Sequence, residues 1–133
     1  TIALITSQST NNGIAKKCYL NQDFLNNAIT VSTNGNNFDC FYHDYNFFPG
    51  TDVEVLINSK LNKYNAIFLC SILHKESDKY SFGKKAKNNA VWDTIIKLPV
   101  DSSGNPDWQF MEEFVKSKED KLNRQLNQLY YSL

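Results

Sequence analysis

The chain has 133 residues, with 14 basic and 14 acidic side chains, 41% hydrophobic and 14% aromatic residues, and few glycines or prolines. This composition is typical of one folded domain and excludes a disordered or fibrous chain. No apolar run approaches the roughly 20 residues needed to cross a bilayer, and the neutral total charge argues against binding nucleic acid by bulk charge alone.

The first half of the sequence predicts strands joined by turns. Residues 2–6 are a short apolar run that ends in the polar stretch SQSTNNG, which predicts a strand and then a loop. Alternation over 27–33, the turn signal NGNN and the returning segment 38–42 predict a hairpin. A further strand is expected at 52–57, after a turn. The first half is therefore expected to be mainly β.

A helix is predicted over residues 62–76, where apolar residues recur at steps of three and four. Because this segment is apolar on most sides, we expect it to pack against the sheet. A lysine-rich connection follows. Residues 91–100 are then expected to form a last strand that ends at Pro99, since proline cannot donate a ladder hydrogen bond.

The C-terminal segment predicts a long helix after the turn at 101–106. Asn105 is expected as its N-cap and Pro106 as its first residue, with Asp107 in the first turn. An apolar stripe interrupted by Lys118 follows, and its members are Trp108, Met111, Val115, Leu122, Leu126, Leu129 and Leu133. The stripe reaches the last residue without a C-cap, which indicates a helix that is cut short or that pairs with a partner helix.

The sequence shows no catalytic pattern. His43 and His74 are far apart, and no nucleophile or second ligand lies near His43, so a position in a turn or on a recognition surface fits it better. Glu112 and Glu113 are adjacent and point about 100° apart on a helix, which fits solvated side chains rather than a carboxylate pair. We therefore expect no enzyme activity, metal or cofactor in this chain.

The three cysteines, Cys18, Cys40 and Cys70, have neither a disulfide framework nor the spacing of a metal site. Cys70 lies in an apolar run and is expected to be a small buried residue. This usage indicates a reducing, cytoplasmic compartment. Because the chain opens on Thr1 rather than Met, we expect an excised domain or a trimmed chain.

Charge is distributed unevenly along the chain. Residues 60–87 hold seven lysines against two acids, whereas residues 93–120 hold seven acids against three lysines. Two surfaces with different partners are therefore expected. The lysine-rich segment HKESDKYSFGKKAKNN could bind DNA phosphates, or it could be a solvated loop.

The polar loop TSQSTNNG also has two interpretations. Asn and Gln side chains can contact adenine, and Ser and Thr can contact several base edges, but the same residues form ordinary turns. Together these patterns predict candidate DNA-binding residues, which are Ser7, Gln8, Ser9, Thr10, Asn11, Asn12, Lys16, Tyr42, His43, Lys79, Tyr80, Lys84, Lys85 and Lys87.

The order of several motifs resembles a known family. ITSQSTNNGI, FYHDYNFFPGTDVEVL, a helix, KYSFGKKAKNNAVWDTIIKLPV and GNPDWQFMEEFVKS follow one another along nearly the whole chain. This order resembles the target recognition domain of the specificity subunit of type I restriction–modification systems, including related fused restriction enzymes. The last two motifs are the most specific part.

The resemblance implies an α/β (α+β) fold, with a β-rich recognition globule at residues 1–104 and a coiled-coil-like spacer helix at 105–133. Such a domain reads one half of a bipartite site in double-stranded DNA, while methyltransferase and restriction subunits methylate adenine and cleave. S-adenosylmethionine would bind only in the methyltransferase subunit. The spacer would pair with a second recognition domain or a second copy through Trp108, Met111, Val115, Leu122, Leu126 and Leu129.

Two other hypotheses remain open. In the first, the chain is an assembly module whose C-terminal helix pairs with a partner without any DNA binding. In the second, it is a small nuclease or transferase, which would need a metal or cofactor constellation that the sequence does not show.

Overall fold

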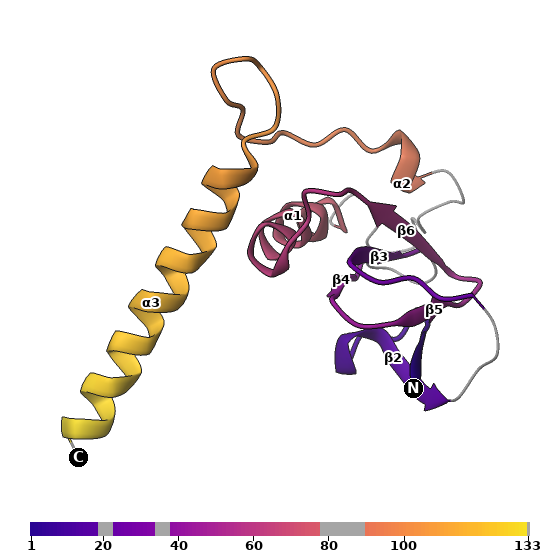
Figure 1. The fold of residues 1–133 in the computed structure, drawn as a ribbon, viewed down its shortest axis with the longest axis horizontal. Coiled ribbons are helices and arrows are strands. Elements are labelled where there is room, and N and C mark those ends of the chain that lie inside the picture. The colour runs from indigo at the N-terminus through magenta and orange to yellow at the C-terminus, as the bar shows by residue number, and fades with distance from the viewer. Residues whose placement is uncertain (19–22, 34–37, 78–89, 133) are drawn as a thin grey trace.

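Two small sheets form the N-terminal half of the chain (Figure 1). The computed structural model describes residues 1–18, 23–33, 38–77 and 90–132. In the first sheet, β1 (Ile2–Ile5) lies between β2 (Ile14–Cys18), to which it is antiparallel, and β5 (Phe47–Pro49), to which it is parallel. The sequence pattern did not predict β2 or β5. The first is an edge strand that carries two lysines, and the second is only three residues long.

In the second sheet, β3 (Ala28–Ser32) is the central strand. It is antiparallel to both β4 (Cys40–His43) and β6 (Val53–Ile57). The predicted hairpin is therefore confirmed as β3 and β4, and the predicted strands at 2–6 and 52–57 are confirmed as β1 and β6. The hairpin turn at 34–37 lies outside the described residues.

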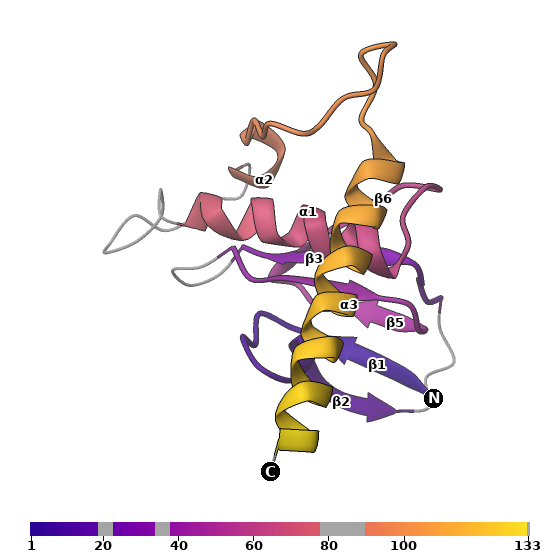
Figure 2. The ribbon, with the colours of Figure 1, turned by 90° about the vertical axis from the view of Figure 1, so that its left-hand side faces the viewer.

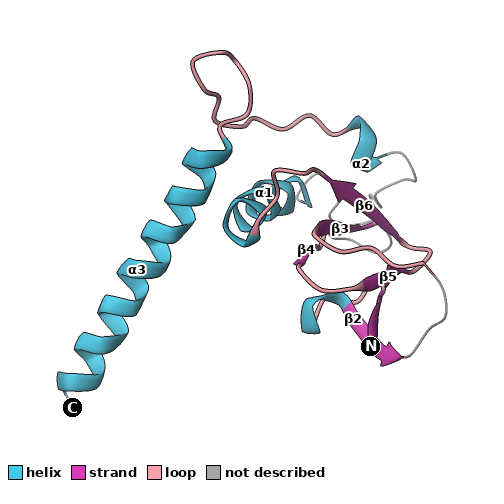
Figure 3. Cartoon of the chain, viewed as in Figure 1, coloured by secondary structure: helices cyan, strands magenta, loops and turns pink. Residues whose placement is uncertain are grey.

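Strand β3 is buried on both faces, although its sequence alternates between apolar and polar residues. Ile29 and Val31 belong to the core shared with helix α1, whereas Ala28 packs into the core of the first sheet. Thr30 also faces the first sheet, where it contacts a buried histidine. The alternation therefore separates two interiors rather than an interior and solvent, because a layer covers each face (Figure 3).

Helix α1 (Lys63–Lys75) confirms the helix predicted over 62–76. The Asn62 side chain accepts hydrogen bonds from the backbone N–H groups of Tyr64 and Asn65, both at 3.0 Å. The Asn65 side chain in turn accepts from the Asn62 N–H at 2.8 Å, which completes a capping box. The helix lies on the second sheet, as expected from its apolar surface, and contacts β4.

The strand predicted over residues 91–100 is wrong. A short helix, α2 (Ala90–Asp93), begins this segment, residues 94–99 are irregular, and only Val100 forms an isolated bridge, to Pro106. Ile96 and Leu98 pack against the core shared with α1, whereas Ile95 is exposed. Alternating burial therefore arises here without a neighbouring strand, because one-sided packing alone produces the same pattern.

The predicted start of the C-terminal helix is also wrong. Helix α3 (Trp108–Ser132) begins two residues later than expected, and the Asp107 carboxylate accepts the Phe110 N–H at 2.9 Å as its N-cap. Asn105 cannot cap the helix, because it closes the preceding turn. Its N–H donates to the Asp101 carboxylate at 3.0 Å, and its carbonyl accepts the Asp101 N–H at 2.8 Å.

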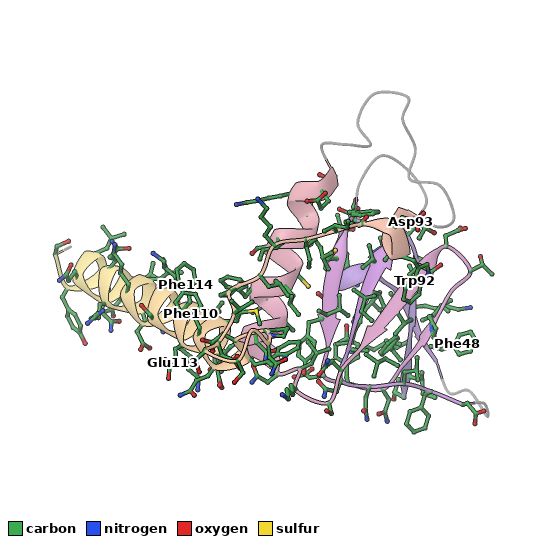
Figure 4. All side chains as sticks on the ribbon, turned by 90° about the horizontal axis from the view of Figure 1, so that it is seen from above. Phe48, Trp92, Asp93, Phe110, Glu113 and Phe114 are labelled. Carbon is green, nitrogen blue, oxygen red and sulfur yellow. The ribbon has the colours of Figure 1, made fainter. Side chains whose placement is uncertain are left out.

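The first part of α3 packs on α1, and the remainder projects away from it (Figure 2). Phe68 of α1 meets Phe110 and Phe114 edge-to-face, with ring centroids 6.4 and 5.6 Å apart, and Figure 4 shows these two rings on α3. Met111 is completely buried in the same core. From Lys116 to Ser132, every described residue of α3 is exposed.

The fold is therefore of the α+β class, as expected, with two small sheets, a packed helix and a long C-terminal helix. Among the described residues, no helix combines the length and apolar character that a membrane span requires. The division into residues 1–104 and 105–133 stays a prediction, although Met111 of the second part is buried in the core of the first.

Candidate nucleic-acid interface

The loop of residues 7–13, which we call the recognition loop, has an unusual backbone. Asn11, Asn12 and Gly13 all have positive φ angles, of 52°, 54° and 77°. This left-handed region is unfavourable for most residues and least unfavourable for Gly and Asn. Such strain persists only where the surrounding structure holds it, and it gathers at functional sites. The sequence signal Asn-Asn-Gly is thus explained by backbone conformation as well as by polarity.

The loop is closed at its base. The Thr6 N–H donates to the Gly13 carbonyl and the Gly13 N–H to the Thr10 carbonyl, both at 3.0 Å. A Cβ atom on Gly13 would lie 3.2 Å from side-chain carbons of Ile5 and Phe41, so this residue presses against both β1 and β4. The base of the recognition loop is therefore held in place against both sheets.

Two of the candidate side chains are engaged within the fold. Gln8 donates through Nε2 to the carbonyls of Thr10 and Ile14, both at 3.1 Å. Asn12 donates through Nδ2 to the Tyr42 carbonyl at 3.0 Å and to the Tyr45 hydroxyl at 2.8 Å. These residues shape the loop, and their amide hydrogens are already used.

Other candidates face outward. Ser9, Thr10 and Asn11 are exposed at the tip of the recognition loop, and Ser7 is half-buried at its start. Lys16 is exposed on β2, which directly follows the loop, and so is Lys17. Lysines on an edge strand also discourage pairing with other strands, so their position fits that role as well as contact with phosphate. The tip and the two lysines lie close together along the chain, and the two lysines point to opposite faces of the strand.

His43 does not lie on a recognition surface, and the expectation that it would is wrong. Its side chain is completely buried between the sheets. Nε2 lies 2.7 Å from the Thr30 hydroxyl, and Nδ1 lies 2.7 Å from the Tyr45 hydroxyl. The ring of Phe47 packs on the imidazole, with centroids 4.7 Å apart. Burial lowers the pKa of His43 to about 4, so the ring is neutral at physiological pH.

The remaining candidates for DNA contact stay predictions. Tyr42 is half-buried and donates its hydroxyl to the Asn27 carboxamide at 2.7 Å. The rest of the set, Lys79, Tyr80, Lys84, Lys85 and Lys87, lies outside the described residues.

The candidate interface on α3 divides into two groups. Met111 is buried and cannot contact a partner, which corrects its assignment to the interface. Trp108 and Val115 are half-buried near the base of the helix. By contrast, Leu122, Leu126 and Leu129 are 55%, 53% and 61% exposed. Spacings of four and three residues place these leucines on one stripe of the helix.

Several of the other titratable groups named in the sequence analysis are partly buried or paired with neighbouring side chains. Cys70, which was expected to be buried, is half-buried. Burial raises the pKa of its thiol to about 12. Glu112 pairs with Lys116 at 3.1 Å, and Glu113 accepts a hydrogen bond from Gln109. In the described part of the chain, no three His, Cys, Asp or Glu side chains gather as a metal site would require.

Sequence reasoning missed the connection between Asn12 and Tyr45. The two residues are far apart along the chain, and only the packing of the first sheet on the second brings them together. For His43 itself, the sequence suggested a turn or a recognition surface rather than a buried contact.

Comparison with known proteins points in one direction. The family model described as type I restriction modification DNA specificity domain matches residues 1–129. The chain is also 32% identical over 124 residues to the "Type II restriction enzyme BgcI specificity subunit S.BcgI" of Heyndrickxia coagulans. That alignment covers 91% of this chain and 36% of the relative, so the chain spans about a third of the relative's length. No solved structure matches the chain.

Proposed function

The chain belongs to the type I restriction modification DNA specificity domain family, and we propose that it reads one half of a bipartite DNA site. Partner subunits methylate adenine and cleave the DNA, and S-adenosylmethionine binds only in the methyltransferase. Such a role belongs in the cytoplasm, where the cellular DNA lies. The observation that supports this proposal most is the recognition loop. Its backbone is held in a left-handed turn, its tip is polar and exposed, and two exposed lysines follow it along the chain.

The two parts of this surface have different tasks. Lys16 and Lys17 contact phosphates, which contributes affinity for any duplex and makes binding dependent on salt. Ser9, Thr10 and Asn11 contact base edges, which is where sequence is read. A tip of short side chains on a fixed backbone can approach the bases closely.

Asn11 is the best candidate for a specific base contact. Its Nδ2 atom donates to the Ile14 carbonyl at 3.2 Å, which holds the amide in one orientation. One amide hydrogen and the Oδ1 oxygen remain for a partner. An Asn side chain uses this pair to contact N7 and N6 of adenine in the major groove, and a good bidentate contact is worth about 1–3 kcal/mol of discrimination. We therefore expect an adenine at one position of the half-site.

The exposed leucines of α3 favour a second role, in assembly. Leu122, Leu126 and Leu129 are each more than half exposed, so they remain accessible to a partner helix, from a second copy or a second recognition domain. The alternative function, an assembly module that does not bind DNA, rests on this same stripe. DNA binding and helix pairing use different surfaces, and they are compatible.

The experiment is a selection of randomised duplexes on the purified chain at low salt, followed by titration at increasing salt. Low salt is needed because the second half-site is missing, and each base pair lost with it would contribute about 1–3 kcal/mol. We expect enrichment of one short sequence. Lys16→Ala/Lys17→Ala should weaken binding to every duplex and reduce the salt slope by about 2.

The matched control is Lys121→Ala/Arg124→Ala, which removes the same charge from exposed positions of α3. It should bind duplexes as the wild type does. The alternative would be favoured if no sequence were enriched while Leu122→Ser/Leu126→Ser/Leu129→Ser abolished self-association in analytical ultracentrifugation.

A further inference from the structure

The recognition loop is attached to the interior of the protein by a relay of half-buried and buried side chains. Asn12 donates to the Tyr45 hydroxyl, this hydroxyl lies 2.7 Å from Nδ1 of His43, and Nε2 of His43 lies 2.7 Å from the Thr30 hydroxyl. The relay thus runs from the loop, through Tyr45 after β4 and His43 at the end of β4, to the central strand β3. No step of the proposed DNA contact uses it.

The chemistry of the amide fixes one end of the relay. Asn12 Nδ2 can only donate, so the Tyr45 oxygen accepts from it. The neutral imidazole carries one hydrogen, so one ring nitrogen of His43 donates to its hydroxyl partner and the other accepts from its partner. Such chains of hydrogen bonds strengthen one another inside a protein. The second hydrogen of Nδ2 is donated to the Tyr42 carbonyl, so both hydrogens of this amide are held by the β4 region.

The relay stands at the point where the loop is most strained. Asn12 has a φ angle of 54° between two other residues with positive φ. Without an outside constraint, the left-handed conformation costs most non-glycine residues roughly 1–2 kcal/mol, and Asn less than most. The contacts of the Asn12 side chain supply that constraint, while the exposed neighbour Asn11 makes only a local contact, with Ile14.

We propose that Asn12 is a positioning residue for DNA recognition. Its amide, held by the Tyr42 carbonyl and the Tyr45 hydroxyl, fixes the left-handed turn that presents Ser9, Thr10 and Asn11. Discrimination between sequences depends on Asn12, although its amide hydrogens are engaged inside the fold. A loop fixed in this way has lost its conformational freedom during folding and does not lose it again on binding. The DNA-related part of this proposal rests on the proposed function.

The first test needs no DNA. Asn12→Gly keeps a residue that tolerates positive φ and removes the side-chain attachment, and Asn11→Gly controls for the backbone freedom that glycine adds by making the same change at the neighbouring exposed position. Hydrogen exchange should be at least about tenfold faster at the Thr6 and Gly13 amides in Asn12→Gly than in wild type, because the loop opens more often. Asn11→Gly should stay within about threefold of wild type. Equal exchange in the two variants would overturn the proposal.

Tyr45→Phe provides a second variant that retains the ring and removes only the hydroxyl. It removes the link from Asn12 to His43 through the hydroxyl, while the direct approach of Asn12 Nδ2 to His43 Nδ1 at 3.4 Å and the edge-on packing of residue 45 against the imidazole are kept. We expect faster exchange at the same two amides, by a smaller factor than in Asn12→Gly because the Tyr42 carbonyl still holds Asn12. Unchanged exchange in Tyr45→Phe would show that the Tyr45 hydroxyl does not help to hold the loop, which would overturn that part of the proposal.

The second test uses competition between the selected duplex and variants with single base changes. Asn11→Gly should relax discrimination at one base position, as loss of a direct contact does. Asn12→Gly should reduce discrimination at every position that the loop contacts, while affinity for unrelated duplexes and its salt slope are unchanged. Loss of preference at a single position in Asn12→Gly would overturn a positioning role. A wild-type chain with no preference would contradict the proposed function, whereas the exchange comparison would still decide whether Asn12 holds the loop.

Discussion

At the scale of single residues, His43 shows how burial changes the role of a titratable group. Both ring nitrogens have hydroxyl partners, and the imidazole is enclosed by Phe47 and Tyr45. Burial lowers the pKa of His43 from 6.5 to about 4, while the nearby carboxylate of Asp44 acts more weakly in the opposite direction. Because burial disfavours the charged ring in the folded state, this shift couples the protonation of His43 to folding.

The stability of the folded protein should therefore decrease as the pH is lowered through one range. Above about pH 6.5 the imidazole is neutral in both states, so its full contribution is present. Between about pH 6.5 and about pH 4 the unfolded chain binds a proton that the folded chain does not, so stability is lost. We expect the free energy of unfolding to decrease by about 2 kcal/mol between about pH 7.5 and about pH 5 from this group.

Urea unfolding at several pH values measures this effect. His43→Gln should show a smaller pH dependence over the same range, whatever its stability at neutral pH. The control is His74→Gln, because the side chain of His74 is exposed. The prediction fails if His43→Gln and wild type lose stability in parallel as the pH decreases.

The polar residues of the recognition loop were predicted from their types, but their division of labour was not. Ser9, Thr10 and Asn11 are exposed, as a base-reading tip requires, whereas Gln8 and Asn12 use their amides inside the fold. Asn is favoured both at base edges and in left-handed turns. The residue type is therefore the same for both roles, and only the backbone conformation and the contacts tell them apart.

At the scale of elements, the ends of helices depend on which residue is free to cap. Asp107 accepts the Phe110 N–H, whereas Asn105 is occupied in the turn that Asp101 organises. Both residues are good capping types, and they stand only two positions apart. Local preference therefore predicted a helix here, and the turn decided where it starts.

Asp107→Ala should destabilise the protein by about 1 kcal/mol, because the first turn of α3 would lose its cap. Asn105→Ala should change stability by no more than about 0.5 kcal/mol, since the bonds of Asn105 to Asp101 are made by its backbone. Thermal unfolding of the two variants provides the comparison. A larger loss in Asn105→Ala than in Asp107→Ala would contradict this assignment of the cap.

At the scale of the whole molecule, α3 belongs to two environments. Its first turns complete the core with Met111 and the phenylalanines that meet Phe68, and its remaining turns lie in solvent with a stripe of leucines. The helix is about 37 Å long, at 1.5 Å per residue. The exposed part, residues 116–132, accounts for about 26 Å of this length, and a rigid extension of that kind fits the proposed spacer role.

Met111→Ala should therefore destabilise the globule by about 2–5 kcal/mol, as loss of a fully buried side chain does. Leu126→Ala should change the stability of the monomer by no more than about 0.5 kcal/mol, because its side chain is exposed. Chemical unfolding at low protein concentration measures both variants without a contribution from self-association. Comparable losses in the two variants would mean that the outer half of α3 also packs on the globule.

The sequence by itself determined most of the longer local elements and the family. Alternation predicted the hairpin of β3 and β4, apolar spacing predicted α1 and α3, and ordered motifs indicated a DNA specificity domain. These features depend on neighbours along the chain, so a single sequence contains them. Pattern failed at residues 91–100, where one-sided burial of Ile96 and Leu98 imitates a strand.

Only the tertiary structure decided what each predicted residue does. It buried His43 and Met111, and it joined Asn12 to Tyr45 and His43 between the two sheets. It also left Leu122, Leu126 and Leu129 without a place in the core. Burial and long-range hydrogen bonds depend on which layers meet, and residues of one type then acquire different surroundings. Composition and spacing do not contain that information, because the contacts form between segments that are distant in sequence.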